Sequence, residues 1–214
     1  MALCFDQIVP WGRSMREYEL MFGLSPEDLS SGILDCGGKR VISVDPLYVV
    51  SGDDIRARFD ATVETMRSQV RATPNDWTWS YHRDPDDLCS YRWAVMQRFL
   101  ADYEAGLREQ RYIVGELPGL PFRAGAFGLA LCSHLLFLYS GLLTAEFHIQ
   151  SVIELCRVAR ETRIFPLLSL DGKFSPHVDA VRAALASAGW ESEIVRVNYE
   201  LQRGGNQMLR VFKS

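Results

Sequence analysis

The chain has 214 residues, of which 48% are hydrophobic and 23% are charged, and its formal net charge is −4 at pH 7. This size and composition predict one globular domain with an apolar core and exclude a disordered or fibrous chain. The slightly acidic balance argues against nucleic acid as the main partner, because binding to phosphates needs a basic face.

Neither a membrane span nor a secretory signal is predicted. The longest apolar run, 127–143, contains Ser133, His134 and Ser140, so it fits a buried strand followed by a loop better than a span. The first residues lack a basic stretch before an apolar one. The five cysteines are scattered, without a Cys-x-x-Cys pair, which favours reduced thiols in a cytoplasm and indicates no metal site.

The first predicted elements are helical and are followed by two strands. Apolar residues at helical spacing predict a helix over 13–23, and "SPEDL", from Ser25, is a helix-start pattern. The runs ILDC at 33–36 and RVISVD at 40–45 read as buried strands. Only a few residues separate these runs, whereas two parallel strands need a crossover of about a dozen residues.

Two amphipathic helices come next, over 51–72 and 87–110, and an aromatic loop separates them. Ser51 and Asp54 have the spacing of a helix-capping box, with Asp in place of the usual Glu. We expect residues 51–110 to form a helical insertion after the second strand that serves as a candidate substrate lid. Its candidate substrate contacts are Trp77, Trp79, Tyr81 and His82.

The second half of the chain alternates strands and helices, which predicts a mostly parallel sheet. A closing hairpin around Gly204-Gly205 adds an antiparallel strand at one edge. The expected elements are strands beginning near 111, 128 and 160, helices beginning at 144 and near 175, and the two hairpin strands after 190.

An adenosine-type ligand would find its usual partners among these residues. Such ligands bind where loops leave the carboxyl ends of adjacent parallel strands. The glycines of "DCGG", 35–38, let a ligand approach the backbone closely. Asp45, at the end of the second strand, can accept from both ribose hydroxyls, and Glu116, after the third, can accept from an adenine amino group.

These blocks resemble the class I S-adenosylmethionine-dependent methyltransferases. "ILDCGG" resembles the start of the first motif of that family, and "VISVDP" its second strand with the acid that holds ribose. "GELPGLPFRAGAFGLALCSHLLFLY" resembles the block of an acid, Leu-Pro-Phe, a loop and the fourth strand. The resemblance covers residues 32–45 and 112–212, and the Leu-Pro-Phe block followed by the hairpin is its most specific part.

The resemblance implies one domain over 1–214 with a Rossmann-like, mostly parallel seven-stranded sheet, an antiparallel terminal hairpin strand and helices on both faces. It implies an enzyme that transfers the methyl group of S-adenosyl-L-methionine directly to a nucleophile, which we expect to belong to a small molecule. No Asn/Asp-Pro-Pro-Tyr/Phe motif follows the fourth strand, which argues against methylation of amino groups on DNA bases. His134 is the candidate catalytic base. The implied cofactor contacts are Arg13, Tyr18, Asp35, Cys36, Gly37, Gly38, Asp45, Pro46, Glu116, Cys132 and Ser133.

Two departures from the family pattern stand out. Gly128 occupies a position where the family usually has Asp, and the glycine-rich loop and helix after the first strand are about a dozen residues short. Either a stretch is missing from the chain as written, or the deletion is real and the cofactor site is incomplete. We favour the first, because a real deletion would expose one face of the sheet.

Other interpretations stay open beside this one. The chain could be a methyltransferase-like module that binds a partner without catalysis, for which the short glycine loop is the best support. A nicotinamide-dependent oxidoreductase would need an unbroken Gly-x-Gly-x-x-Gly motif, which is absent. His134 could be a structural histidine, and the tryptophan cluster could be core.

Overall fold

The fold is taken from a computed structural model, which describes residues 2–6 and 41–213. Within these residues there are seven strands, four α-helices and two short 3-10 helices. The strands are β1 (Ala2–Asp6), β2 (Val41–Val44), β3 (Tyr112–Ile113), β4 (Phe127–Ser133), β5 (Ala159–Phe165), β6 (Glu191–Arg196) and β7 (Gln207–Phe212). The helices are α3 (Gly52–Ala72), α4 (Pro85–Arg108), α5 (Ala145–Val158) and α6 (Val178–Ser187), with 3-10 turns η1 (Pro46–Val49) and η2 (Pro74–Asp76).

The predicted elements of the second half and of the insertion form close to their expected positions. Ser51 caps α3 by accepting a hydrogen bond from Asp54 N, and Thr144 caps α5 by accepting one from Phe147 N. The polar residues before each apolar stripe therefore fix both helix starts. The predicted helix over 13–23 lies outside the described residues.

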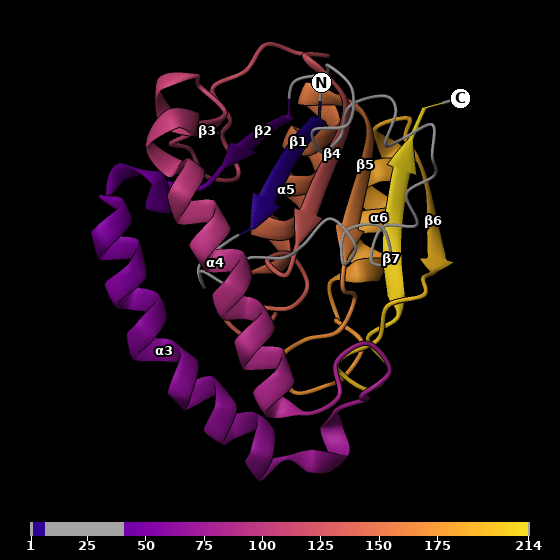
Figure 1. The fold of residues 1–214 in the computed structure, drawn as a ribbon. Coiled ribbons are helices and arrows are strands. Elements are labelled where there is room, and N and C mark those ends of the chain that lie inside the picture. The colour runs from indigo at the N-terminus through magenta and orange to yellow at the C-terminus, as the bar shows by residue number, and fades with distance from the viewer. Residues whose placement is uncertain (1, 7–40, 214) are drawn as a thin grey trace.

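The predicted Rossmann-like sheet is wrong as a description of this chain. The strands whose side chains are described form two small groups, a parallel pair of β2 with β3 and a four-stranded group in the order β4, β5, β7, β6. In the second group only the β4–β5 pairing is parallel. The backbone of β1 lies between the two groups and hydrogen-bonds to β2 and to β4, which gives the overall order β3-β2-β1-β4-β5-β7-β6 (Figure 1).

The strand beside β2 is also different from the predicted one. We expected Ile33–Cys36 to pair with the strand that ends at Asp45, but both edges of β2 are occupied, by β1 and by β3. The physical reason is the connection, because the few residues between 36 and 40 cannot make a parallel crossover. Residues 7–40, which join β1 to β2, are long enough to do so. The Gly38–Lys39 junction itself lies outside the described residues.

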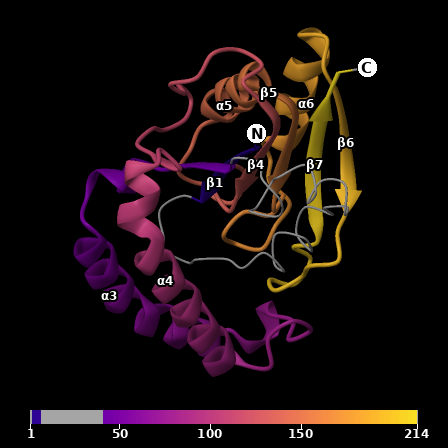
Figure 2. The ribbon, with the colours of Figure 1, turned by 45° about the horizontal axis from the view of Figure 1, so that its top comes forward.

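The described helices do not form layers on both faces of a sheet. Helices α5 and α6 pack against each other and against β4, β5 and β6, where they bury the main apolar core. Helices α3 and α4 pack on each other as a separate arm with its own small core of Ile55, Phe59, Met96 and Tyr103. Figures 1 and 2 show α3 and α4 side by side, with α4 on the side of the strands.

The arm joins the rest of the molecule at both of its ends. At one end, α4 leads into β3, and Asp102 accepts hydrogen bonds from Arg111 at 2.6 and 2.8 Å and from the Tyr112 hydroxyl at 2.8 Å. At the other end, the loop between α3 and α4 contacts the loop between β6 and β7 (Figure 1). The arm therefore extends from the β2–β3 pair to the far side of the four-stranded group.

Candidate functional site

Asp45 directly follows β2 and is buried, with 3% of its surface exposed. Its Oδ1 accepts a hydrogen bond of 2.7 Å from Leu47 N and so caps η1, in which Pro46 is the first residue. Its backbone N donates to Ile113 O at 3.3 Å, which joins the ends of β2 and β3. The predicted ribose acid is thus a buried carboxylate at the carboxyl end of a parallel strand, and it also has a structural role as a cap.

Glu116 lies beyond the end of β3 on the same side of the β2–β3 pair. Its side chain is exposed, and its backbone forms a turn with Gly119. The preceding Gly115 packs closely on β2, since a Cβ at this position would lie 2.9 Å from Val44 Cγ1. Glycine at this position therefore lets the loop after β3 pack against the end of β2.

At the end of β4, Cys132 and Ser133 are completely buried, and His134 follows in a left-handed backbone conformation with φ of 56°. Ser133 Oγ and His134 Nδ1 are 2.7 Å apart and share a hydrogen bond. His134 N donates to Phe165 O at 2.7 Å, and the His134 ring contacts the edge of the Phe165 ring at a centroid distance of 5.4 Å. The imidazole thus has contacts that fix both its backbone and its ring.

β1 lies between β2 and β4, so the ends of these two strands are roughly 10 Å apart, twice the spacing of neighbouring strands. By backbone register, Asp6 stands opposite Ser133 at the carboxyl end of β1. Sequence reasoning missed Asp6, although "LCFD" has the same pattern as "ILDC" and "VISVD", an apolar run that reaches an acid. It was missed because the segment 33–36, which glycines follow, was taken as the first strand of the sheet.

Aromatic rings connect His134 to the arm. Phe165 contacts Tyr199 at a centroid distance of 6.0 Å, Tyr199 contacts Tyr81 at 5.8 Å, and Tyr81 contacts His82 at 4.8 Å. His82 is 2% exposed, so it is a core residue of this cluster. Tyr81 is therefore linked through rings to the end of β5 beside His134, but Tyr81 and His82 are largely used in packing.

Backbone contacts hold the tip of the arm in place. Thr78 N donates to Leu201 O at 2.8 Å, and Trp77 forms an antiparallel bridge with Gln202. Arg203 Nη2 donates to Trp77 O at 3.3 Å. No sequence pattern predicted that the loop 197–206 contacts the arm, because this contact joins segments more than a hundred residues apart.

Six predicted cofactor residues lie outside the described residues and cannot be placed. They are Arg13, Tyr18, Asp35, Cys36, Gly37 and Gly38. Among residues 2–6 and 41–213, no group of three or more His, Cys, Asp or Glu side chains is close enough to hold a metal ion. In the same part of the chain, none of the helices is long and apolar enough to cross a membrane.

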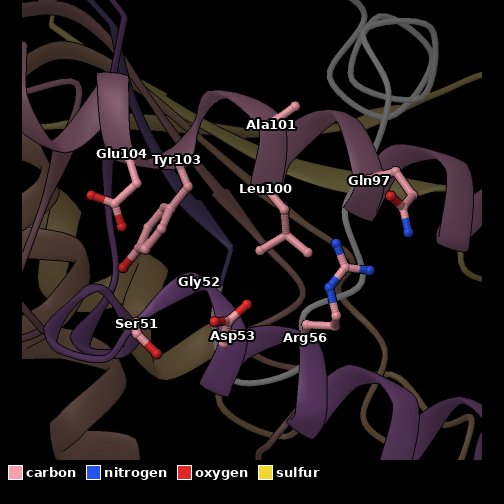
Figure 3. A pocket seen from close by; sticks show the side chains of 9 residues that line it. All are labelled: Ser51, Gly52, Asp53, Arg56, Gln97, Leu100, Ala101, Tyr103 and Glu104. Carbon is pink, nitrogen blue, oxygen red and sulfur yellow. The ribbon is translucent and has the colours of Figure 1, made fainter.

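A groove of about 380 Å³ lies between the first turn of α3 and the second half of α4. Figure 3 shows Leu100 beside the charged side chains of Asp53, Arg56 and Glu104. None of the residues that line this groove is a predicted site residue. Its mixture of opposite charges on two helices of the arm gives it no clear ligand chemistry.

The comparisons with known proteins give a relative but no family. No family model matches the chain. The chain is 28% identical over 212 residues to a protein of Methanocaldococcus jannaschii described as "Uncharacterized protein MJ0045", and the alignment covers 92% of this chain and 93% of that protein. The similarity therefore extends over the strands and the arm together, and it carries no information on function.

Proposed function

We propose that this chain is an S-adenosylmethionine-dependent methyltransferase that acts on a small molecule. The observation that carries the proposal is the position of Asp45, a buried carboxylate at the carboxyl end of β2 beside the loop that contains Glu116. A carboxylate at such a strand end suits two vicinal ribose hydroxyls, because each of its oxygens can accept from one of them. The motif resemblance of 32–45 and 112–212 supports the same ligand.

The described residues fit this cofactor in part. Asp45 would hold the ribose, Glu116 would lie toward the adenine, and Ser133 with His134 would flank the sulfonium end across β1. When bound, the cofactor would supply an electrophilic methyl group on a positively charged sulfur. The chain's own residues would then align the acceptor and exclude water, which are the main contributions of a protein to such a transfer.

The arm is the proposed acceptor side of the site. Its tip lies over the loop between β6 and β7, and the ring contacts of Tyr81 lead toward His134 through Tyr199 and Phe165. An aromatic wall suits a small organic acceptor. We also propose a cytoplasmic location, which the scattered cysteines without a Cys-x-x-Cys pair favour.

One observation favours a second candidate, a binding module without catalysis. β1 is Ala2–Asp6, so the glycines at 37 and 38 do not follow the strand that lies beside β2. A site without a glycine loop at that strand would hold the cofactor weakly or not at all. The two candidates differ in one measurable property, which is affinity for the cofactor.

Isothermal titration calorimetry with S-adenosylmethionine and with S-adenosylhomocysteine tests the proposal. A methyltransferase should bind both with a Kd in the micromolar range, about −8 kcal/mol. NADH and ATP serve as control ligands, because an oxidoreductase or a general nucleotide site would bind them instead. No heat from either sulfur compound at millimolar concentration would refute the proposal and leave the binding module.

A variant of the arm tests the acceptor side separately. Trp79 is only half-buried, so Trp79→Ala should leave the fold intact, whereas the same change at buried His82 would damage the core. We expect Trp79→Ala to alter acceptor turnover while the affinity for S-adenosylmethionine stays within about threefold, roughly 0.65 kcal/mol. A large loss of cofactor affinity would contradict an acceptor role for the arm.

A further inference from the structure

His148 is a completely buried histidine on α5, and its Nε2 has no hydrogen-bond partner among the described residues. The other ring nitrogen, Nδ1, lies 2.8 Å from Thr144 O. A carbonyl oxygen can only accept a hydrogen bond, so Nδ1 carries a proton, and in the neutral ring the lone pair is on Nε2. A neutral His148 therefore has a basic nitrogen that is buried without a partner.

Three aromatic rings contact His148. Phe137, in the loop after β4, stacks on it at a centroid distance of 5.4 Å; His177, just before α6, lies at 4.8 Å, and Phe147 at 6.3 Å. Within the described part of the chain, His177 is the titratable group that acts on the ring, and the carboxylates of α5, α6 and β5 do not. Ser151, one turn along α5, is equally buried, but its Oγ is not hydrogen-bonded to Nε2. In this arrangement a proton on Nε2 would have no acceptor.

A charged ring is unfavourable at this position. Burial lowers the pKa of His148, because the imidazolium would lose its water; the hydrogen bond to Thr144 O acts in the opposite direction, and repulsion from a charged His177 lowers the pKa further. A histidine in water has a pKa of about 6.5. The ring therefore binds a proton more readily once it has left this site. The buried arrangement is fully stable above about pH 6.5 and loses stability as the pH falls below that value.

The loop 134–143, which the ring contacts, contains a strained residue. Phe137 has a positive φ of 70°, which is unfavourable for a bulky side chain. The Ser140 hydroxyl donates to Phe137 O at 2.6 Å and also shares a 2.6 Å hydrogen bond with the Ser175 hydroxyl, and Ser140 O accepts from His177 Nε2 at 3.2 Å. Strain of this kind persists only while the surroundings hold the backbone in place. Loss of the stacked His148 ring would therefore favour opening of the loop.

We propose that His148 is a pH-dependent switch for the loop after β4. The neutral ring packs against Phe137 and His177 and keeps the loop 134–143 in place. When Nε2 takes up a proton, the imidazolium moves out to water, and Phe137 and the segment around Ser140 lose the contact that holds them. This inference does not depend on the proposed function. His134 begins the loop, so the switch would act on any site at the end of β4.

Hydrogen exchange of the whole chain, measured by mass spectrometry, tests the switch. The amides of Tyr139, Ser140, Leu142 and Leu143 donate to carbonyl oxygens within the loop, so their exchange reports its opening. If His148 has a pKa of about 6.5 in the open loop and stays neutral in the closed one, the opening equilibrium increases about tenfold from pH 7.5 to pH 5.5. After correction for intrinsic rates, we expect protection of these amides to fall about tenfold, while the β6–β7 hairpin keeps its protection.

Two variants assign the effect to His148, because neither can take up the proton. His148→Phe keeps a ring against Phe137, and His148→Gln keeps a donor for Thr144 O. Each should show the same loop protection at both pH values. His134→Asn changes a half-exposed histidine of the same loop to a residue that tolerates a left-handed backbone, so it is the matched control and should keep the tenfold loss.

Three results would overturn the proposal. They are equal loop protection at both pH values in the wild type, a tenfold loss that persists in the His148 variants, and a loss that disappears in His134→Asn. Nitrogen-15 NMR of the wild-type histidine rings gives an answer even if neither His148 variant folds. The His148 ring, identified by its proximity to Phe137 and Phe147, should gain its charge over the same pH range in which the loop opens. Charging of this ring in a loop that stays protected would show that His148 is not the switch.

Discussion

The two roles of Asp45 can be separated by a pair of substitutions. As a cap, the carboxylate accepts a 2.7 Å hydrogen bond from Leu47 N at the start of η1. As the proposed cofactor ligand, it accepts from ribose hydroxyls. Asp45→Ala removes both interactions. Asp45→Asn keeps an oxygen that can accept from Leu47 N, but it removes the charge and replaces the other acceptor oxygen by an NH2 donor.

The expected magnitudes follow from these contacts. Loss of the cap should lower the free energy of unfolding of Asp45→Ala by about 0.5–2 kcal/mol, the usual cost of replacing a capping side chain by alanine. Asp45→Asn should lose less than about half of that amount. Both variants should lose about 1–3 kcal/mol of binding free energy for S-adenosylmethionine, or roughly 5- to 150-fold in Kd, because each lacks a charged acceptor for the ribose.

Urea unfolding followed by tryptophan fluorescence gives the first quantity, and calorimetric titration at a temperature where all three proteins are folded gives the second. Unchanged affinity in Asp45→Asn would show that the carboxylate is not the ribose acid. Equal destabilisation by the two substitutions would show that the hydrogen bond to Leu47 N is not what Asp45 contributes to stability.

Two further predictions concern the junction of the arm with β3. Gly106→Ala should destabilise the protein by about 1–3 kcal/mol in urea unfolding, since the added Cβ would lie 2.2 Å from the Tyr112 ring. Gly128→Ala is the matched control. Its added Cβ has no atom within 4 Å, so it should change stability little. The hydrogen bond from Arg111 lowers the pKa of Asp102, so the stabilisation from this pair is present above the ordinary carboxylate pKa of about 4 and is lost as the pH falls through the lowered value. Asp102→Asn should therefore be less stable than wild type at pH 6, by no more than about 1 kcal/mol, because the pair with Arg111 is so exposed. This difference in stability should shrink toward pH 3. A difference that does not change with pH would refute an ionic origin of the stabilisation.

Local patterns were sufficient for the elements of the arm and of the second half. The capping residues Ser51 and Thr144 and the apolar stripes behind them place α3 and α5 within a residue of their observed starts. The hairpin around Gly204-Gly205 likewise forms, since β6 and β7 pair antiparallel. These features depend on residues a few positions apart, so they can be read from the sequence.

Strand partners could not be read in the same way. Three segments of the chain end an apolar run at or near an acid, and the sequence pattern alone favoured 33–36 as the neighbour of β2 because glycines follow it. Chain connectivity decided otherwise, since a parallel crossover needs more residues than lie between 36 and 40. The segment Ala2–Asp6 takes the place instead, because residues 7–40 give it a connection of sufficient length.

The candidate site shows the same division. The sequence by itself determined which residues carry usable chemistry, namely Asp45 before a proline, Ser133 next to His134, and the aromatic loop of the arm. Only the tertiary structure decided that Asp45 also caps η1, that His82 is core, and that the arm tip rests on the loop 197–206. These features depend on hydrogen bonds and ring contacts between segments far apart in the chain, and such contacts form only when the strands have their final order.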